Sequence, residues 1–204
     1  MRKNVMRAGF LLVALLLGPV GCGGPGLTPL PADGTIVAFG DSLTQGVGAG
    51  QGEDYPTVLA QLSGLHVVNA GVSGEQTPAG LKRLPQVLAA EQPDLLLLLL
   101  GGNDILRNRP PAAIRDNLAQ MIETAQGQGV QVMLVAVPEK RLFSSAAPFY
   151  PELAEQYGVP LVDSLVGELL RTPGYKSDPI HLNAEGYRQM AQALDSALRD
   201  AGAY

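Results

Sequence analysis

The fold can be worked out from the sequence Asp94-Leu-Leu-Leu-Leu-Leu-Leu-Gly-Gly-Asn-Asp104, in which six consecutive leucines run directly into two glycines and two polar residues. Leucine by itself favours a helix. The run is too short for a useful helix, however, because Asp94 and the Gly101-Gly102 pair confine it. A short, continuous apolar stretch between such boundaries is typical of a strand buried on both faces of a parallel sheet.

Strands and helices alternate on both sides of this run. Further strands are predicted at Thr35–Phe39, around Val67 and Val68, at Gln131–Val137 and at Leu161–Val162. Apolar residues at helical spacing predict helices at 56–62, from Thr77 onward with a kink or restart at Pro85, and at 114–125, 145–157, 166–170 and 187–198. This order predicts a three-layer α/β/α sandwich with a mainly five-stranded parallel sheet, formed by a single domain at residues 34–204.

Composition excludes several classes of protein. The chain has 204 residues and a net charge of −5, which argues against a nucleic-acid partner because such proteins need a basic surface. One cysteine and two histidines do not suffice for a structural zinc site or an intramolecular disulfide. Charged residues make up only 16% of the chain, which fits a protein with a buried sheet.

The N-terminus has the layout of an export signal. Basic residues are followed by an apolar run at Phe10–Leu17 and then by small residues before Cys22. This arrangement resembles a bacterial lipoprotein signal at residues 1–21, in which Cys22 becomes the acylated first residue; plain export with an inert cysteine is the alternative. Residues 22–33 are predicted to be a short flexible tether. The expected location is the cell envelope or periplasm, with a lipid anchor in a membrane.

Four polar segments lie where the predicted strands end, or ahead of the last helix, and ligands bind at this edge of parallel sheets. They are Gly40-Asp41-Ser42-Leu43, Asn69-Ala-Gly71-Val-Ser73-Gly74, Gly101-Gly102-Asn103-Asp104 and Asp178-Pro179-Ile180-His181. A serine at a strand-to-helix turn can expose its hydroxyl, and an aspartate can fix the tautomer of a nearby histidine. Glycine N–H groups and an asparagine amide can donate to a developing oxyanion.

Each segment alone has an ordinary structural explanation. Ser42 can belong to a turn or cap a helix, and Asn103 can cap the helix that follows it. The segment 69–74 can be a plain loop, and His181 a solvated loop residue. The other histidine, His66, precedes a strand with no acid close by in sequence and is expected to be structural.

Together, and in this order, the four segments resemble the GDSL family of the SGNH-hydrolase superfamily, over residues 35–198. The stretches 67–74 and 101–107 look especially like the periplasmic multifunctional esterases, a subgroup with acyl-CoA thioesterase, lysophospholipase and arylesterase members. The resemblance implies a flavodoxin-like fold and a serine hydrolase that acts on a small-molecule ester or a lipid. It implies no cofactor and no metal ion.

The resemblance also implies roles for individual residues. Ser42 would be the nucleophile, His181 the general base and then the acid, and Asp178 the residue that orients His181. The oxyanion hole would consist of three donors, which are the backbone N–H of Ser42, the backbone N–H of Gly74 and the side-chain amide of Asn103. Gly71 is the competing choice for Gly74. These roles describe two-step acyl transfer through an acyl-enzyme.

Two other functions remain open on the sequence. One is an O-deacetylase that uses the same residues on envelope polysaccharide, and the other is a non-catalytic envelope lipoprotein that binds a partner. Four apolar residues are candidates to line an acyl pocket, with ordinary loop packing as the alternative; they are Leu43, Leu106, Leu142 and Phe143. Asp41 either touches substrate or holds the turn of the nucleophile through backbone hydrogen bonds.

Overall fold

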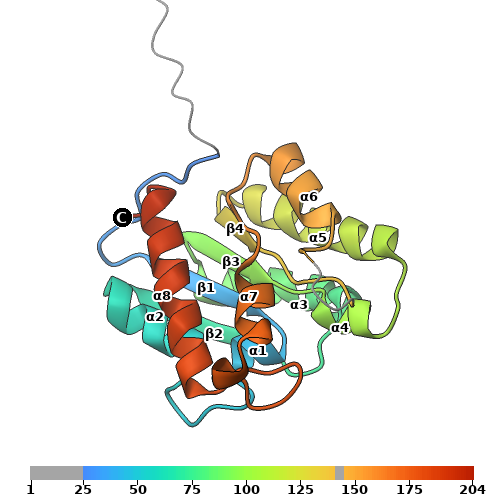
Figure 1. Ribbon diagram of the computed structural model, residues 1–204. Helices are drawn as coiled ribbons and strands as arrows, with labels where there is room; N and C mark the ends of the chain where they lie inside the picture. Colours follow the sequence, from blue (N-terminus) through green and yellow to red (C-terminus); the bar gives the residue numbers. More distant parts are fainter. Residues whose placement is uncertain (1–24, 141–144) are drawn as a thin grey trace, which may run out of the picture.

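The computed structural model describes residues 25–140 and 145–204, and within these ranges one parallel sheet has the strand order β2-β1-β3-β4-β5 (Figure 1). Its strands are β1 (Thr35–Gly40), β2 (His66–Gly71), β3 (Leu95–Leu99), β4 (Gln131–Val135) and β5 (Leu161–Val162). The predicted α/β fold with a five-stranded parallel sheet is confirmed. The predicted signal at 1–21, Cys22, Leu142 and Phe143 lie outside the described residues.

The leucine run forms the centre of the core. β3 lies between β1 and β4, and all six residues Leu95–Leu100 are fully buried. Leu97, for example, is in register with Ala38 on one side and Met133 on the other. Because helices cover both faces of the sheet, every position of this strand is apolar, and burial overrides the helical preference of leucine.

Helices cover both faces of the sheet (Figure 1). They are α1 (Ser42–Gln45), α2 (Tyr55–Ser63), α3 (Thr77–Glu91), α4 (Gly102–Leu106), α5 (Pro111–Gln126), α6 (Phe149–Tyr157), α7 (Leu165–Arg171), the 3-10 helix η1 (Pro173–Tyr175) and α8 (Ala184–Asp200). Helix α8 packs against α2 and α7, whereas α5 packs against α3 and α6. In the described part of the chain, no helix is both long and apolar enough to cross a bilayer.

Several predicted boundaries are wrong at the ends of strands. β2 continues to Gly71, so Asn69 and Gly71 belong to the strand and not to the loop after it. β4 ends at Val135, two residues early, and the short helices α1 and α4 were not predicted. Helix α3 does not restart at Pro85; that residue is exposed, where water can reach the carbonyl that loses its helical hydrogen bond.

The segment 25–33 differs from the flexible tether that the sequence predicts. The N–H of Leu27 donates to the carbonyl of Ala201 and that of Leu30 to Ala203, both at 2.7 Å. The Gln131 side chain adds two hydrogen bonds to the backbone of Thr28. This stretch is therefore fixed along the domain, because its backbone groups find partners just after α8.

Candidate active site

The tight turn between β1 and α1 places Ser42 at the carboxyl end of the sheet. A Cβ at Gly40 would collide with the carbonyl oxygen of Leu99 and the Thr44 side chain, so only glycine fits there. Asp41 is the N-cap of α1, and its Oδ1 accepts from the Leu43 N–H at 3.1 Å. Ser42 is therefore the first residue of the helix and not its cap.

A chain of hydrogen bonds joins the predicted serine, histidine and aspartate. His181 Nε2 lies 3.0 Å from Ser42 Oγ, although 139 positions separate the two residues. His181 Nδ1 lies 2.7 Å from Asp178 Oδ2. The Ser42 side chain needs a base within this distance to act as a nucleophile, and the imidazole needs an acceptor on its far nitrogen to hold the right tautomer.

The Asp178 carboxylate is held on both oxygens. Oδ2 contacts the His181 ring, and Oδ1 accepts from the backbone N–H groups of Ile180 and His181 at 2.8 and 2.9 Å. The hydrogen bond from the His181 ring, followed by that from Ile180, lowers the pKa of Asp178 below its usual value. The carboxylate therefore stays ionised at neutral pH, with a geometry fixed by the loop itself.

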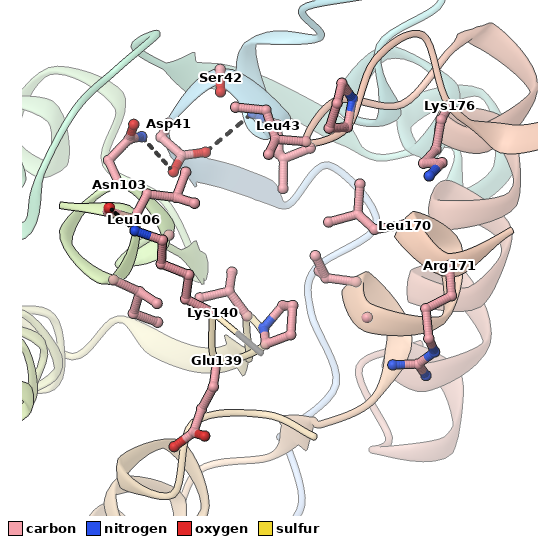
Figure 2. Close-up of a pocket in the computed structure, with 18 residues that line it drawn as sticks. Asp41, Ser42, Leu43, Asn103, Leu106, Glu139, Lys140, Leu170, Arg171 and Lys176 are labelled. Atoms are coloured by element: carbon pink, nitrogen blue, oxygen red, sulfur yellow. Dashed lines mark hydrogen bonds between the residues drawn. The ribbon is translucent and has the colours of Figure 1, made fainter. Parts of the chain in front are cut away.

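Asn103 lies beside this chain, inside α4 and not at its cap, which is Gly101. Its Nδ2 donates to Asp41 Oδ2 at 3.0 Å, as Figure 2 shows, and its Oδ1 accepts from Arg107. An amide NH2 group has two hydrogens, so one remains for an oxyanion. Asp41 therefore holds both the turn that carries Ser42 and the Asn103 side chain.

Of the two glycines considered in the second segment, only Gly74 has a free N–H. The Gly71 N–H donates to Asn69 Oδ1 at 3.0 Å, and Gly71 itself packs against the backbone of α1. The Gly74 N–H has no acceptor in the described part of the chain. Gly74 is exposed and has a φ of +76°, a conformation that favours glycine.

Burial strongly affects Asp41. The residue is 3% exposed, and desolvation raises the pKa of its carboxyl to about 6, against the lowering effect of the Leu43 N–H and the Asn103 amide. Folding therefore favours the protonated acid. The contribution of protonated Asp41 to the stability of the folded protein is complete below the unfolded pKa of 3.8. It is lost as the pH rises through about 6.

The Asp41→Asn variant is expected to lose this pH dependence. A difference of about two pKa units corresponds to about 3 kcal/mol of unfolding free energy, lost by the wild type between pH 4 and pH 7. Urea denaturation of both proteins at pH 4, 5, 6 and 7 measures the difference between them. The same change with pH in wild type and variant would assign the effect to other groups.

A cavity of about 530 Å³ opens next to Ser42. Figure 2 shows Leu106 and Leu170 on opposite sides of the hollow that Ser42, Asp41 and Leu43 also line. The wall is mainly apolar and comes from several elements, with the residues Leu43, Ile105, Leu106, Val137, Pro138, Val166, Leu170, Pro179 and Ile180. Leu43 and Leu106 thus line a pocket next to Ser42, as the sequence had suggested they could.

Sequence reasoning missed much of this pocket. Val166 and Leu170 come from α7, which carries no recognisable motif, and three basic residues, Lys140, Arg171 and Lys176, also line the cavity together with Glu139. The position of α7 after the short strand β5 brings Val166, Leu170 and Arg171 near Ser42. His66 is exposed at the start of β2, whereas Ser42 lies just after the carboxyl end of β1.

Hydrogen-bonded Ser42, His181 and Asp178 at the carboxyl edge of a parallel sheet are the arrangement of a serine hydrolase. Residues 38–189 match the model of the GDSL-like Lipase/Acylhydrolase family. The chain belongs to this family and is a serine ester hydrolase.

Individual relatives agree with the family. An arylesterase of Vibrio mimicus is 34% identical over 174 residues, which cover 80% of this chain and 87% of the relative. Thioesterase 1/protease 1/lysophospholipase L1 of Escherichia coli is 32% identical over 81% of this chain and 83% of its own. The crystal structure of TesA superposes with a TM-score of 0.75 at 28% identity, covering 82% of this chain and 99% of TesA.

A more distant relative carries a different name. The uncharacterized lipoprotein YqeF of Bacillus subtilis is 28% identical over 148 residues, which cover 65% of this chain and 58% of that protein.

Proposed function

We propose that Ser42, His181 and Asp178 hydrolyse carboxylic esters through an acyl-enzyme. The observation that supports this most strongly is the continuous path from Ser42 Oγ through both ring nitrogens of His181 to Asp178, with distances of 3.0 and 2.7 Å. His181 takes the Ser42 proton as Oγ attacks the ester carbonyl, and then gives it to the leaving alcohol. Water, activated by the same imidazole, releases the acid.

Three donors surround the position of the developing oxyanion in this proposal. They are the Ser42 N–H, the Gly74 N–H and the second hydrogen of the Asn103 amide. Neither backbone N–H has an acceptor among the described residues, and the Asn103 amide is already oriented by Asp41. Such donors stabilise charge that exists only in the transition state, so they accelerate the reaction without tightening the binding of substrate.

The proposed substrates are aryl esters, thioesters or lysophospholipids with short to medium acyl chains. The apolar cavity next to Ser42 suits an acyl chain, and the basic residues that line it suit an anionic group nearby. The names of the relatives, arylesterase and thioesterase/lysophospholipase, support this range. They do not favour a polysaccharide O-deacetylase, and an apolar cavity of this size suits a sugar acetate poorly.

Filling the cavity is expected to shorten the preferred acyl chain. Leu170 lines the cavity and is only partly buried, so Leu170→Trp has room to project into it. Each buried methylene is worth about 0.8 kcal/mol, or about fourfold in kcat/KM. Excluding two methylenes of the acyl chain would therefore lower octanoate hydrolysis relative to butyrate hydrolysis by about 15-fold. The measurement compares kcat/KM for p-nitrophenyl esters with acyl chains of two to twelve carbons.

The matched control is Leu62→Trp, at a residue of α2 that is 40% exposed and does not line the cavity. It should leave the ratio of octanoate to butyrate hydrolysis unchanged. If Leu170→Trp also left that ratio unchanged, the acyl chain would have to lie elsewhere.

We further propose that Cys22 is lipidated and that the protein works at a membrane of the cell envelope. The signal-like N-terminal sequence supports this, as does the name of the related lipoprotein YqeF. Mass spectrometry of the mature N-terminus is expected to find acylated Cys22, and Cys22→Ser is expected to move the enzyme from the membrane fraction to the soluble fraction. An unmodified Cys22 in the mature protein would contradict the anchor.

A further inference from the structure

The N–H of Gly74 sits on a loop that has little regular structure of its own. Residues 72–76 join β2 to α3, and Val72, Ser73 and Gly74 are all exposed. A Cβ at Gly74 would find no atom within 4 Å, so no packing holds this residue directly. The Glu75 N–H donates to the Val72 carbonyl at 3.1 Å and closes a turn around Gly74. The direction of the Gly74 N–H therefore depends on how this turn is held, through the two neighbours of Gly74.

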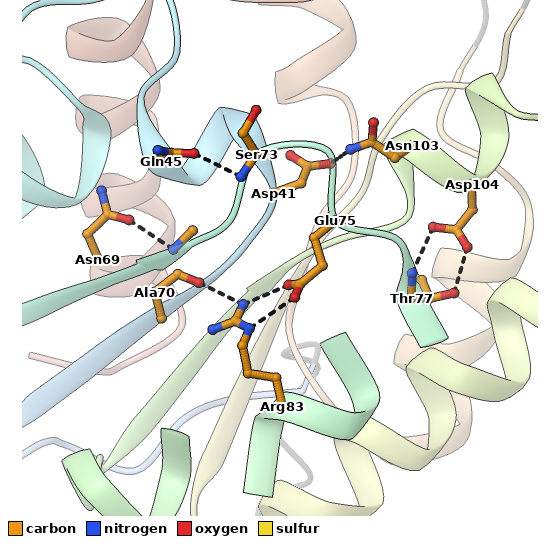
Figure 3. Close-up of polar contacts among 11 residues, drawn as sticks. Asp41, Gln45, Asn69, Ala70, Ser73, Glu75, Thr77, Arg83, Asn103 and Asp104 are labelled. Atoms are coloured by element: carbon orange, nitrogen blue, oxygen red, sulfur yellow. Dashed lines mark hydrogen bonds and ion pairs between the residues drawn. The ribbon is translucent and has the colours of Figure 1, made fainter. Parts of the chain in front are cut away.

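The residue after Gly74 is fixed by a partly buried ion pair. Glu75 is 8% exposed, and its two oxygens accept from Arg83 Nε at 3.0 Å and Nη2 at 2.7 Å. Arg83 comes from α3, donates a further bond to the carbonyl of Ala70 at the end of β2, and lies 4.1 Å above the Phe39 ring. Figure 3 shows this guanidinium between the loop and the strand.

The residue before Gly74 is fixed by a different element. The Ser73 N–H donates to Gln45 Oε1 at 2.8 Å. Gln45 is the last residue of α1, the helix that begins with Ser42. Figure 3 shows the Gln45 side chain reaching across to the loop. The loop at residues 72–76 is thus bound directly to α1, the short helix that begins with Ser42.

We propose that Gln45 and Arg83 are positioning residues, which hold the two neighbours of Gly74 so that its N–H points at the oxyanion. This inference rests on the proposed role of Gly74. An oxyanion donor works only when it is already in place before charge develops, and a displacement of about 1 Å can cost a large part of the rate. Neither side chain needs to touch the substrate for this effect.

The sharpest test is the pair Gln45→Leu and Gln45→Glu. Gln45 is exposed, so neither change should disturb folding, and only glutamate keeps an acceptor for the Ser73 N–H. Gln45→Leu is expected to lower kcat for p-nitrophenyl butyrate about 10-fold with KM within twofold, because a misplaced donor affects mainly the transition state. Gln45→Glu is expected to remain within about threefold of the wild type, since its donor stays in place.

A second readout separates positioning from stability. The affinity for a trifluoromethyl ketone inhibitor, which forms a tetrahedral oxyanion on the serine, should fall in parallel with kcat in Gln45→Leu. All rates are normalised to the number of sites that a fluorophosphonate titrates. An equal kcat per titrated site in Gln45→Leu and wild type would overturn the role of Gln45.

Arg83→Met tests the other side of the loop, with Arg188→Met as control. Arg188 forms a comparable ion pair with Glu185, but on the exposed surface of α8. Arg83→Met should lower kcat per titrated site by at least 10-fold, and Arg188→Met should not change it. If Arg83→Met does not fold, the two Gln45 variants decide alone.

The failure of the proposed function and the failure of this inference give different results. A wild-type protein without esterase activity would refute the proposed function. An active wild type whose Gln45→Leu variant keeps the same kcat would refute only the positioning role.

Discussion

Replacing Ser42 with alanine is expected to lower ester hydrolysis by a factor on the order of 10⁴–10⁶ while leaving the protein folded. The hydroxyl is the only group removed, and its one hydrogen bond to a side chain in the described structure goes to His181. Without it, no acyl-enzyme forms, and water must attack the ester with help from the oxyanion donors alone. Loss of the nucleophile should therefore remove nearly all turnover.

The measurement is the hydrolysis of p-nitrophenyl butyrate by wild type and Ser42→Ala, with thermal unfolding followed in parallel. Ser63→Ala is the control, because Ser63 ends α2, ahead of β2, and its hydroxyl donates to the Leu59 carbonyl and accepts from the Leu65 N–H. A purified Ser42→Ala protein that turns over the ester at the wild-type rate would show that another residue is the nucleophile.

Replacing Asn103 with alanine is expected to lower kcat by about 10²–10³-fold, which corresponds to about 2.7–4 kcal/mol of transition-state stabilisation. The amide already donates to Asp41, so its second hydrogen is held in one direction without reorganisation. KM should change little, because the oxyanion exists only during reaction. The comparison of kcat and KM between wild type and variant measures this effect.

Asn103→Asp sharpens the interpretation, because it keeps the size of the side chain and replaces the donor with an acceptor. The variant is expected to be at least as slow as Asn103→Ala. In the wild type the Asn103 amide lies 3.0 Å from Asp41 Oδ2, so the substitution places a second carboxylate beside that of Asp41. An unchanged kcat with a raised KM in Asn103→Ala would instead show that Asn103 binds the ester in its ground state.

Much of the fold follows from local sequence. The run of leucines between Asp94 and Gly101 is readable as a buried strand because both of its ends are marked, and the observed β3 is fully buried. The same argument predicts three of the polar segments at strand ends, and the fourth, Asp178–His181, ahead of the last helix. The structure brings Ser42, His181 and Asp178 together there, and Asn103 reaches the same place through Asp41.

Other features depend on contacts between distant residues and could not be predicted. Leu170 lines the cavity only because α7 packs against α8 beside the site. The backbone of Leu27 is fixed because the chain after α8 offers it an acceptor, which composition alone does not reveal. The double role of Asp41, as cap of α1 and partner of Asn103, likewise requires two segments 62 positions apart to meet.

Labelling with a fluorophosphonate, followed by peptide mapping, tests most directly whether His181 activates Ser42. In the wild-type protein the label is expected on Ser42 alone, within minutes. In His181→Ala, which removes the base 3.0 Å from Ser42 Oγ, labelling should be slower by orders of magnitude. A folded wild-type protein that remains unlabelled at Ser42, or a His181→Ala variant that labels equally fast, would contradict the account.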